Sequence, residues 1–475
     1  MTLFRHIVFV FSLMSLLLPS AGAAQAVSGY PSFADLAERL LPSVVNISTL
    51  HDKEADDPEN NIETNVETIF NKEKSNRVSL GSGFIIDENG YIITNNHVID
   101  KASAVNVVLA DKTTAEAVII GKDPKTDIAL IKIDADTKLQ PVTFGNSDKI
   151  RIGDWVLAIG NPFGLGGSVT AGIVSAKSRD IESGPYDSFI QTDASINQGS
   201  SGGPMFNMAG EVIGVNTAIF STNGGSMGVG FTIPVNLIDF VVRQLKENGS
   251  VRRGWIGVKM QPAGGDITDS VGLKKAKGVL ISSVNENSSA AKAGIKAGDI
   301  VLKFDGTVID DTKNLSRMVA ESQIGKTADF EIWRDGQVIP LRVLIEEMPA
   351  QEPPALPKEI LPGVETQTPD LPTAAPMGIS LSEVNAETIN KYHLAADTAG
   401  VVVTEVVSGS DAMNKGLKEG DVITQIDKQA VFDVETALSF INEAQLENNR
   451  PVLLQIKDND VFHFVAVKLI ENDQN

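Results

Sequence analysis

Short runs of apolar residues follow one another along residues 78–233, and Gly, Asn or Asp separates each run from the next. Successive runs begin about eight to twelve residues apart, which is the spacing of strands in a β-barrel or β-sandwich. Examples are the runs at 83–86, 91–94, 105–109, 117–120, 128–133, 155–159, 170–175 and 228–233. Helical spacing of apolar residues occurs at 32–41 and at 237–247. The pattern predicts a mainly β unit that a helix closes at each end.

A second pattern begins after this unit. The sequence AGIKAGDIV at 293–301 recurs as KGLKEGDVI at 415–423, and β runs at 278–284 and 400–407 precede the two copies. Two copies are too few for a solenoid, so the repeat predicts two independent small domains. Eight prolines lie between them at 349–376, a composition that predicts an extended, semi-rigid linker.

The N-terminus has the three parts of a secretory signal peptide at residues 1–26. A short polar region precedes an apolar run at 7–18, and small residues then allow cleavage after Ala23 or Ala26. A membrane anchor is the alternative, but the apolar run is short for a span. Further along, residues 51–74 are acidic and weakly periodic, which predicts a long exposed loop, either solvated or functional.

Composition excludes several classes of site. The chain has 475 residues and a net charge of −21, so nucleic acid is not an expected partner. It has no cysteine, which excludes a cysteine nucleophile and thiolate metal ligands, and its five histidines are scattered. No G-x-x-x-x-G-K-[ST] loop for nucleotide phosphates occurs. We therefore expect no metal and no cofactor.

The stretch GSSGGP at 199–204 is the strongest candidate for chemistry. Glycines on both sides of a serine allow a sharp turn and leave N–H groups free to point at one spot, as a nucleophile with an oxyanion hole requires. An ordinary serine- and glycine-rich loop is the alternative. An α/β-hydrolase would need a later histidine, but His393 and His463 lie in the repeated region.

The remaining arrangement to test has the histidine first along the chain, then the aspartate, then the serine. His97 lies at the end of a predicted strand in TNNHVI, and Asp127 directly precedes another strand in KTDIAL. Either residue alone would be read as structural, since aspartates commonly cap turns. Together with Ser201 they occur in the order that double β-barrel proteases use.

These motifs resemble the triad motifs of the HtrA (Do-like, DegP/DegQ) serine endoproteases. Supporting runs are GSGFI at 81–85, AIGNPFG at 158–164, QTDA at 191–194 and GFTIP at 230–234. The family usually has asparagine where this chain has Ser200. The resemblance implies a mainly β fold: a chymotrypsin-like double β-barrel protease domain followed by two PDZ domains.

The resemblance also implies a role for each residue. Ser201 would attack the peptide carbonyl, His97 would transfer the proton, and Asp127 would orient His97. The backbone N–H groups of Gly199 and Ser201 would form the oxyanion hole.

Spacing from Ser201 locates a specificity pocket by analogy with double-barrel proteases. The pocket base would be the uncharged Ser195, which argues against cleavage after Lys or Arg, and Ile196 follows it. The flanking loop would contribute Ile219, Phe220, Met227 and Val229. We expect cleavage after Val, Ala or Ile; the alternative is that these side chains belong to the core.

The two repeats resemble PDZ domains, which bind a peptide C-terminus on a loop and pair it with a strand edge. The loop in the first repeat would be Gly254, Trp255, Ile256 and Gly257, whereas 377–379 in the second is a looser match. Arg179 matches a family position that reports PDZ occupancy to the active site.

The predicted organisation is a signal peptide at 1–26, a protease domain at 27–248, PDZ domains at 252–348 and 377–472, and a linker at 349–376. We expect an exported, periplasmic, ATP-independent endopeptidase that degrades misfolded or unfolded proteins under PDZ control. Expected partners are unfolded polypeptides, their C-termini and other copies of the chain, as a homotrimer or larger assembly. The alternative is a PDZ-based peptide-binding chaperone with weak or silent protease activity. Peripheral membrane association is left open.

Overall fold

The computed structural model describes residues 32–51, 77–161, 167–221, 225–273, 278–349, 373–395, 398–446, 451–458 and 461–469. The predicted signal peptide, nearly all of the predicted acidic loop and most of the predicted linker lie outside these ranges. Within them, no helix is both long and apolar enough to span a membrane.

The first half of the β unit is a closed barrel. Its strands, in order around the barrel, are β1 (Val44–His51), β2 (Arg77–Ile85), β3 (Tyr91–Asn95), β6 (Ile128–Ile133), β5 (Thr114–Asp123) and β4 (Ala104–Val108). β6 is apolar on both faces because both are buried. Ala129 and Ile131 pack inside this barrel, whereas Ile128 and Leu130 pack toward the second barrel.

The second half is a seven-stranded sheet that additional pairing of β11 with β12 closes. Its order is β11 (Pro204–Asn207), β8 (Trp155–Gly160), β9 (Ser168–Arg179), β10 (Phe189–Thr192), β13 (Gly230–Pro234), β12 (Glu211–Ile219) and β7 (Thr143–Phe144). Helix α2 (Ala34–Leu40) precedes the first barrel. Helix α4 (Val235–Asn248) follows the second barrel and packs on both barrels. The predicted mainly β, double-barrel fold is confirmed.

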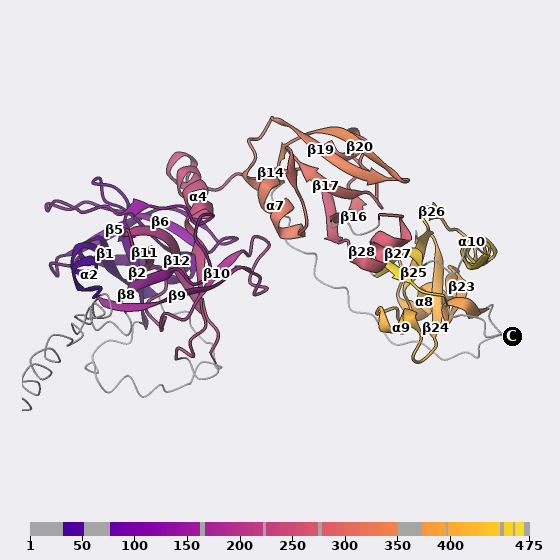
Figure 1. Cartoon of the computed structure of the whole chain (residues 1–475), viewed down its shortest axis with the longest axis horizontal. Helices are drawn as coiled ribbons and strands as arrows, with labels where there is room; N and C mark the ends of the chain where they lie inside the picture. Colours follow the sequence, from indigo (N-terminus) through magenta and orange to yellow (C-terminus); the bar gives the residue numbers. More distant parts are fainter. Residues whose placement is uncertain are drawn as a thin grey trace, which may run out of the picture.

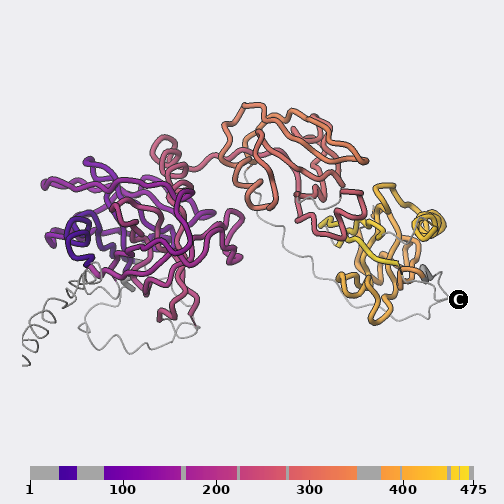
Figure 2. Tube along the Cα trace, in the orientation of Figure 1, coloured from indigo at the N-terminus to yellow at the C-terminus, as the bar shows by residue number. Residues whose placement is uncertain are grey.

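The first repeat follows α4 and forms its own sheet (Figures 1 and 2). The strand order is β15 (Val258–Pro262), β16 (Val279–Val284), β17 (Ile300–Phe304), β19 (Thr327–Arg334) and β20 (Gln337–Leu344). Helix α7 (Thr312–Glu321) lies against β14 (Gly254–Trp255) and β15. β14 in turn pairs with β21 (Glu346–Glu347).

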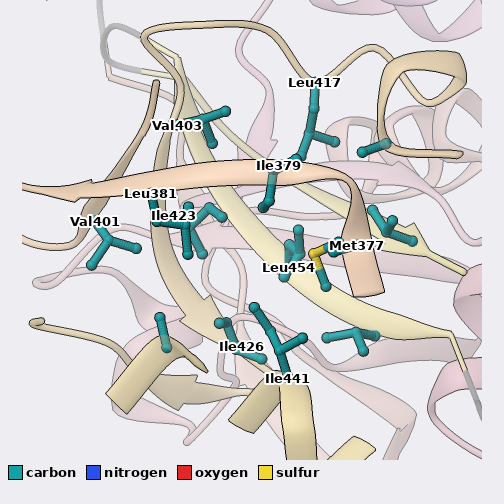
Figure 3. Packing of buried hydrophobic residues seen from close by; sticks show 14 of the residues in the cluster. Met377, Ile379, Leu381, Val401, Val403, Leu417, Ile423, Ile426, Ile441 and Leu454 are labelled. Carbon is teal, nitrogen blue, oxygen red and sulfur yellow. The ribbon is translucent and has the colours of Figure 1, made fainter. Parts of the chain in front are cut away.

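The second repeat has the same order with one strand added in front. It runs β22 (Thr373–Ala374), β23 (Ile379–Glu383), β24 (Val401–Val406), β25 (Val422–Ile426), β27 (Val452–Asp458) and β28 (Val461–Val467). Helix α10 (Val434–Leu446) covers one face, and Met377, Ile379 and Ile441 meet in the core (Figure 3). The linker predicted to reach residue 376 therefore ends earlier, because β22 pairs with β23 and belongs to this domain.

The two repeats pack against each other through a shared apolar cluster. Leu280 of the first repeat packs with Leu453 and Phe464 of the second. The Gln261 side chain accepts a hydrogen bond from Phe464 N (2.7 Å) and donates one to Phe464 O (2.8 Å). β16 is therefore buried on both faces over residues 279–281, which explains why these three residues are apolar in succession.

One position of the repeat differs in electrostatic surroundings between the two copies. Asp299 of the first repeat is buried and accepts hydrogen bonds from Arg334 Nε (2.7 Å) and Nη2 (2.6 Å). Its equivalent, Asp421, is also buried, but its Oδ1 has no hydrogen-bond partner among the described residues. Burial raises the pKa of Asp421, and the nearby Asp458 adds to this rise, against the hydrogen bond from Lys418 N.

Asp421→Asn should therefore stabilise the second repeat at neutral pH. A raised pKa means that folding favours the neutral carboxyl of Asp421. The contribution of this carboxyl to the folding stability is fully present below its pKa in the unfolded chain, and it is lost as the pH rises through its pKa in the folded protein. The stabilisation should shrink from pH 7 toward pH 4 in calorimetric unfolding. The matched change Asp299→Asn should instead destabilise at pH 7 by about 1–3 kcal/mol, because it weakens a charge-assisted pair. Equal effects of the two substitutions would contradict this account.

Candidate active site

The loop at 199–204 is a tight turn between β10 and β11. Ser200 N donates to Asn197 O (2.9 Å), and Gly203 N donates to Ser200 O (3.1 Å). Gly202 has φ 86°, and a Cβ there would lie 2.1 Å from Ser82 O. Glycine is thus required at this position by both conformation and space.

Ser82 anchors this loop to the first barrel. Its N–H donates to Ser201 O (2.8 Å), and its buried hydroxyl donates to Gly199 O (2.7 Å). The same hydroxyl accepts a hydrogen bond from Asn161 N (2.8 Å). Residue 82 lies in the supporting run at 81–85, but local sequence predicted no role for its side chain, since only the fold brings it next to residue 201.

His97 and Asp127 meet as the motif order predicted. His97 is the second residue of α3 (Asn96–Ile99), which directly follows β3, and Asp127 directly precedes β6. His97 Nδ1 lies 2.7 Å from Asp127 Oδ2, and His97 N donates to Oδ1 (2.9 Å). An ionised carboxylate only accepts hydrogen bonds, so Nδ1 carries the proton and Nε2 is left as the acceptor.

Thr217 of β12 joins these two residues to the serine. Its hydroxyl donates to Asp127 Oδ2 (2.7 Å), and its carbonyl oxygen accepts from Ser201 Oγ (3.3 Å). The structure therefore gathers the three predicted residues around one threonine that the sequence analysis did not single out. In this arrangement the Ser201 hydroxyl donates to a backbone carbonyl rather than to the imidazole of His97.

The two predicted oxyanion donors are both available. Within the described part of the chain, the N–H groups of Gly199 and Ser201 donate to no protein acceptor. Gly199 has φ 92°, a conformation that favours glycine. Two unpaired N–H groups beside a serine hydroxyl are suited to bind an oxygen that gains negative charge.

The six predicted pocket residues differ in exposure. Ile196 is buried and packs in the apolar cluster of the second barrel, and Ile219 packs against that cluster. Phe220 and Met227 are exposed by 63% and 53%. Ser195 is exposed and Val229 half-buried; Ser195 O accepts from Thr170 Oγ1 (3.0 Å), and Val229 O from Phe220 N (3.0 Å).

A cavity of about 350 Å³ borders His97 and Asp127, and none of those six residues lines it. Its walls include His97, Asp127, Lys125, Tyr186 and Leu237. It is therefore adjacent to the imidazole but separate from the predicted pocket.

Arg179 ends β9, and its Nε donates to Gln191 Oε1 (2.9 Å). The loop that follows Arg179 contacts the first repeat. Lys313 Nζ of α7 pairs with Asp180 and donates to Gly184 O (3.3 Å). The predicted regulatory position thus directly precedes a loop that both domains hold.

A buried ion pair also connects the first repeat to the turn before Asp127. Arg253 Nη1 and Nη2 lie 3.1 and 2.5 Å from the two carboxylate oxygens of Asp123, and the side chains are only 6% and 4% exposed. Thr126 Oγ1 donates to the same carboxylate, and the guanidinium lies 4.8 Å from the Tyr186 ring. The turn that presents Asp127 is therefore fixed partly from outside the protease domain.

The predicted peptide loop of the first repeat directly follows Arg253. Gly254 and Trp255 form β14, and Ile256 is buried in the core of the repeat. Ile256 O accepts from Ala290 N (3.0 Å) and Gly257 O from Asn285 N (2.8 Å), while Gly257 has φ 81°. The loop is a formed turn at the start of β15.

Family models match both parts of the chain: a trypsin-like peptidase domain at residues 81–215, and PDZ domains at 254–345 and 375–469. Below, the two repeats are called PDZ1 and PDZ2. A probable periplasmic serine endoprotease, DegP-like, from Brucella suis biovar 1 (strain 1330) is 44% identical over 403 residues, covering 82% of this chain and 74% of the relative. Its counterpart in Bartonella henselae is 39% identical over 471 residues, covering 92% and 90%.

Two solved structures are similar along most of their length. The HtrA-type protease AlgW with tripeptide has a TM-score of 0.58 and 38% identity, and the match covers 68% of this chain and 99% of that one. AlgW with decapeptide has a TM-score of 0.56 and 37% identity, with 68% and 100% covered.

Arg253→Met should destabilise the protease domain by about 3–5 kcal/mol, because it leaves the Asp123 carboxylate buried without its partner. Adding Asp123→Asn should recover most of the loss. Arg252→Met is the matched control. The Arg252 guanidinium pairs with Glu347 at the exposed surface, so we expect this substitution to change the stability little. Calorimetric unfolding measures all three variants; an Arg253→Met protein as stable as Arg252→Met would contradict this role for the ion pair.

Proposed function

The chain belongs to the HtrA family of DegP-like serine endoproteases, and from this we propose that Ser201, His97 and Asp127 cleave peptide bonds in unfolded or misfolded proteins of the periplasm. The observation that carries the proposal is the Asp127 carboxylate, which binds His97 Nδ1 at 2.7 Å and leaves Nε2 free to accept the serine proton. The periplasmic location follows from the names of the relatives and agrees with the predicted signal peptide.

In the proposed reaction, the Ser201 side chain first rotates so that its hydroxyl leaves Thr217 O and donates to His97 Nε2. Catalytic hydrogen bonds are often loose before substrate binds, so this resting geometry is compatible with activity. Ser201 Oγ then attacks the carbonyl carbon while His97 takes its proton, and Asp127 stabilises the imidazolium. His97 later gives the proton to the leaving amine, and water hydrolyses the acyl-enzyme by the reverse proton route.

The tetrahedral oxyanion would accept hydrogen bonds from Gly199 N and Ser201 N, the two unpaired N–H groups of the loop. Removing one preorganised oxyanion-hole donor from a hydrolase costs about 3–4 kcal/mol of transition-state stabilisation. Ser200 stands between them and contributes backbone only, so a serine there is compatible with the geometry.

We propose cleavage after small or medium aliphatic residues. Ser195 carries no charge, and Ile196 and Ile219 belong to or pack against an apolar cluster, so a Lys or Arg side chain would find no counterion among these residues. Phe220 and Met227 are exposed apolar side chains near this region and are available to cover a bound substrate.

PDZ1 is proposed to capture peptide C-termini and to pass its occupancy to the protease. The AlgW complexes contain a tripeptide and a decapeptide, and the loop at 254–257 precedes β15, the strand that would pair with a peptide. Lys313 and Arg253 contact the loop after Arg179 and the turn before Asp127, respectively. Peptide binding would shift the population of active-site loops without ATP.

Self-association into a homotrimer or larger assembly is the proposed quaternary state. Ile152, Trp155 and Met208 are exposed by 66%, 49% and 43%, and the ring of Phe33 lies 5.6 Å from that of Trp155. The pairing of β8 with β11 brings residue 208 beside the start of β8. An exposed apolar surface of this kind is typical of a protein interface.

A peptide-binding chaperone with a silent protease is the second candidate, favoured by the hydrogen bond of Ser201 Oγ to Thr217 O. A fluorescent fluorophosphonate separates the two functions. With an unfolded substrate and an activating C-terminal peptide present, we expect the wild type to be labelled and to cut. Ser201→Ala should do neither, with a rate at least about 10⁴-fold lower. A wild type that neither labels nor cuts would exclude the protease function.

Thr217→Val should lower kcat/KM by about 10–100-fold, since a hydrogen bond to a charged carboxylate is worth about 1.5–3 kcal/mol. Thr217→Ser keeps the hydroxyl and should retain most of the rate, which distinguishes loss of the hydrogen bond from general misfolding. Steady-state cleavage of an unfolded substrate measures both variants; equal rates for Val and Ser would show that the bond to Asp127 does not contribute.

A further inference from the structure

The two PDZ domains contain equivalent strands at the start of their sheets. β15 and β23 each follow a glycine with positive φ, Gly257 at 81° and Gly378 at 71°. Each pairs antiparallel with the next strand, and both ladders shift register after the second residue of the first strand. β15 and β23 therefore correspond residue by residue. Their outer edges, which face away from β16 and β24, can be compared at equivalent positions.

The outer edges do differ. In PDZ1, β15 is the first strand of its sheet, and no strand of the described chain pairs with its second edge. In PDZ2, β22 pairs with that edge of β23: Thr373 lies opposite Ser380, and Ala374 lies opposite Ile379. The edge that PDZ1 leaves open is thus already paired at its first two residues in PDZ2.

β22 also runs in the direction of a captured peptide. A PDZ ligand places its terminal carboxylate at the loop that begins the groove strand, and it must therefore run antiparallel to that strand. β22 is antiparallel to β23, and its second residue lies opposite the first residue of β23. The chain then continues through the 3₁₀ turn η4 (Ala375–Met377) into the loop, where a free ligand would end.

The same segment lies against the helix of the groove. η4 contacts α10, and α10 also contacts β23. Met377, the last residue of η4, is fully buried and packs with Ile379 and Leu454 in the domain core (Figure 3). Residues 373–374 are therefore paired with β23, η4 lies against α10, and Met377 anchors the segment in the core.

We infer that residues 373–374 act as a built-in pseudoligand of PDZ2, so that each chain offers one edge, that of β15, to a peptide C-terminus. A segment tethered this closely competes at an effective concentration of about millimolar or above, which a free peptide must exceed. The inference about β15 rests on the proposed peptide binding by PDZ1, whereas the inference about PDZ2 does not.

The number of peptides that bind per chain tests the pseudoligand inference. The protein is the mature full chain carrying Ser201→Ala, which prevents cleavage of the peptide. The probe is a hexapeptide with an aliphatic C-terminal residue and a free carboxylate, and titration calorimetry measures how many peptides bind per chain. The same peptide with a C-terminal amide is the control. Thr373→Pro with Ala374→Pro removes both N–H groups of β22. Gly257→Val damages the PDZ1 loop, since a Cβ there would lie 2.2 Å from Ser288 Cβ.

We expect one site per parent chain, two after the proline changes, none after Gly257→Val, and one when all are combined. Two sites in the parent chain, a site that survives Gly257→Val alone, or a count unchanged by the prolines in a folded protein would overturn the inference. If the parent chain binds nothing and the proline variant binds one peptide, PDZ2 is closed as inferred and the proposed role of PDZ1 fails.

Hydrogen exchange gives a second readout that requires no substitution in PDZ2. In the Ser201→Ala chain, amides of 379–383 should be protected before peptide is added and unchanged afterwards. Amides of 258–262 should gain protection only with peptide. Peptide-induced protection of 379–383, or fast exchange there without peptide, would contradict the pseudoligand.

Discussion

The carboxylate of Asp127 is the point on which the site depends. It receives His97 N, His97 Nδ1 and Thr217 Oγ1 at 2.7–2.9 Å, while its own backbone has φ 55°, which is unfavourable for a non-glycine residue. The main chain holds it there: Asp127 O accepts from Asn96 N (3.1 Å) and from the Asn95 amide (2.8 Å). A strained aspartate that collects this many donors persists only where the surroundings determine its position.

The site consequently exists only at the junction of the two barrels. His97 and Asp127 come from the first barrel, and Ser201 and Thr217 come from the second. Ser82 ties the two together through Ser201 O and Gly199 O. The Asp123–Arg253 pair extends this dependence to PDZ1, because the turn that presents Asp127 is held by a residue of another domain. Movement of PDZ1 would therefore change the environment of Asp127 through a short path of direct contacts.

The spacing of apolar runs predicted a mainly β unit, and the internal repeat predicted two small domains. Motif order and the family resemblance predicted the two barrels and the meeting of His97 with Asp127. They did not predict Thr217, Ser82 or the Asp123–Arg253 pair. Those contacts join residues about 90 to 130 positions apart, and each side chain looks ordinary within its own strand or turn. β22 was missed for another reason: two residues at the end of a proline-rich stretch carry no periodicity, and only the pairing with β23 makes them a strand.

The tautomer of His97 tests the central claim most directly, because the account requires the Asp127 carboxylate to hold the proton on Nδ1. Nitrogen-15 NMR of histidine-labelled protein measures it, and the resonance is assigned by its loss in His97→Gln. We predict that at neutral pH the ring carries its proton on Nδ1, and that Asp127→Asn shifts the proton to Nε2. A wild-type ring protonated on Nε2 alone would contradict the account, since Ser201 would then have no base.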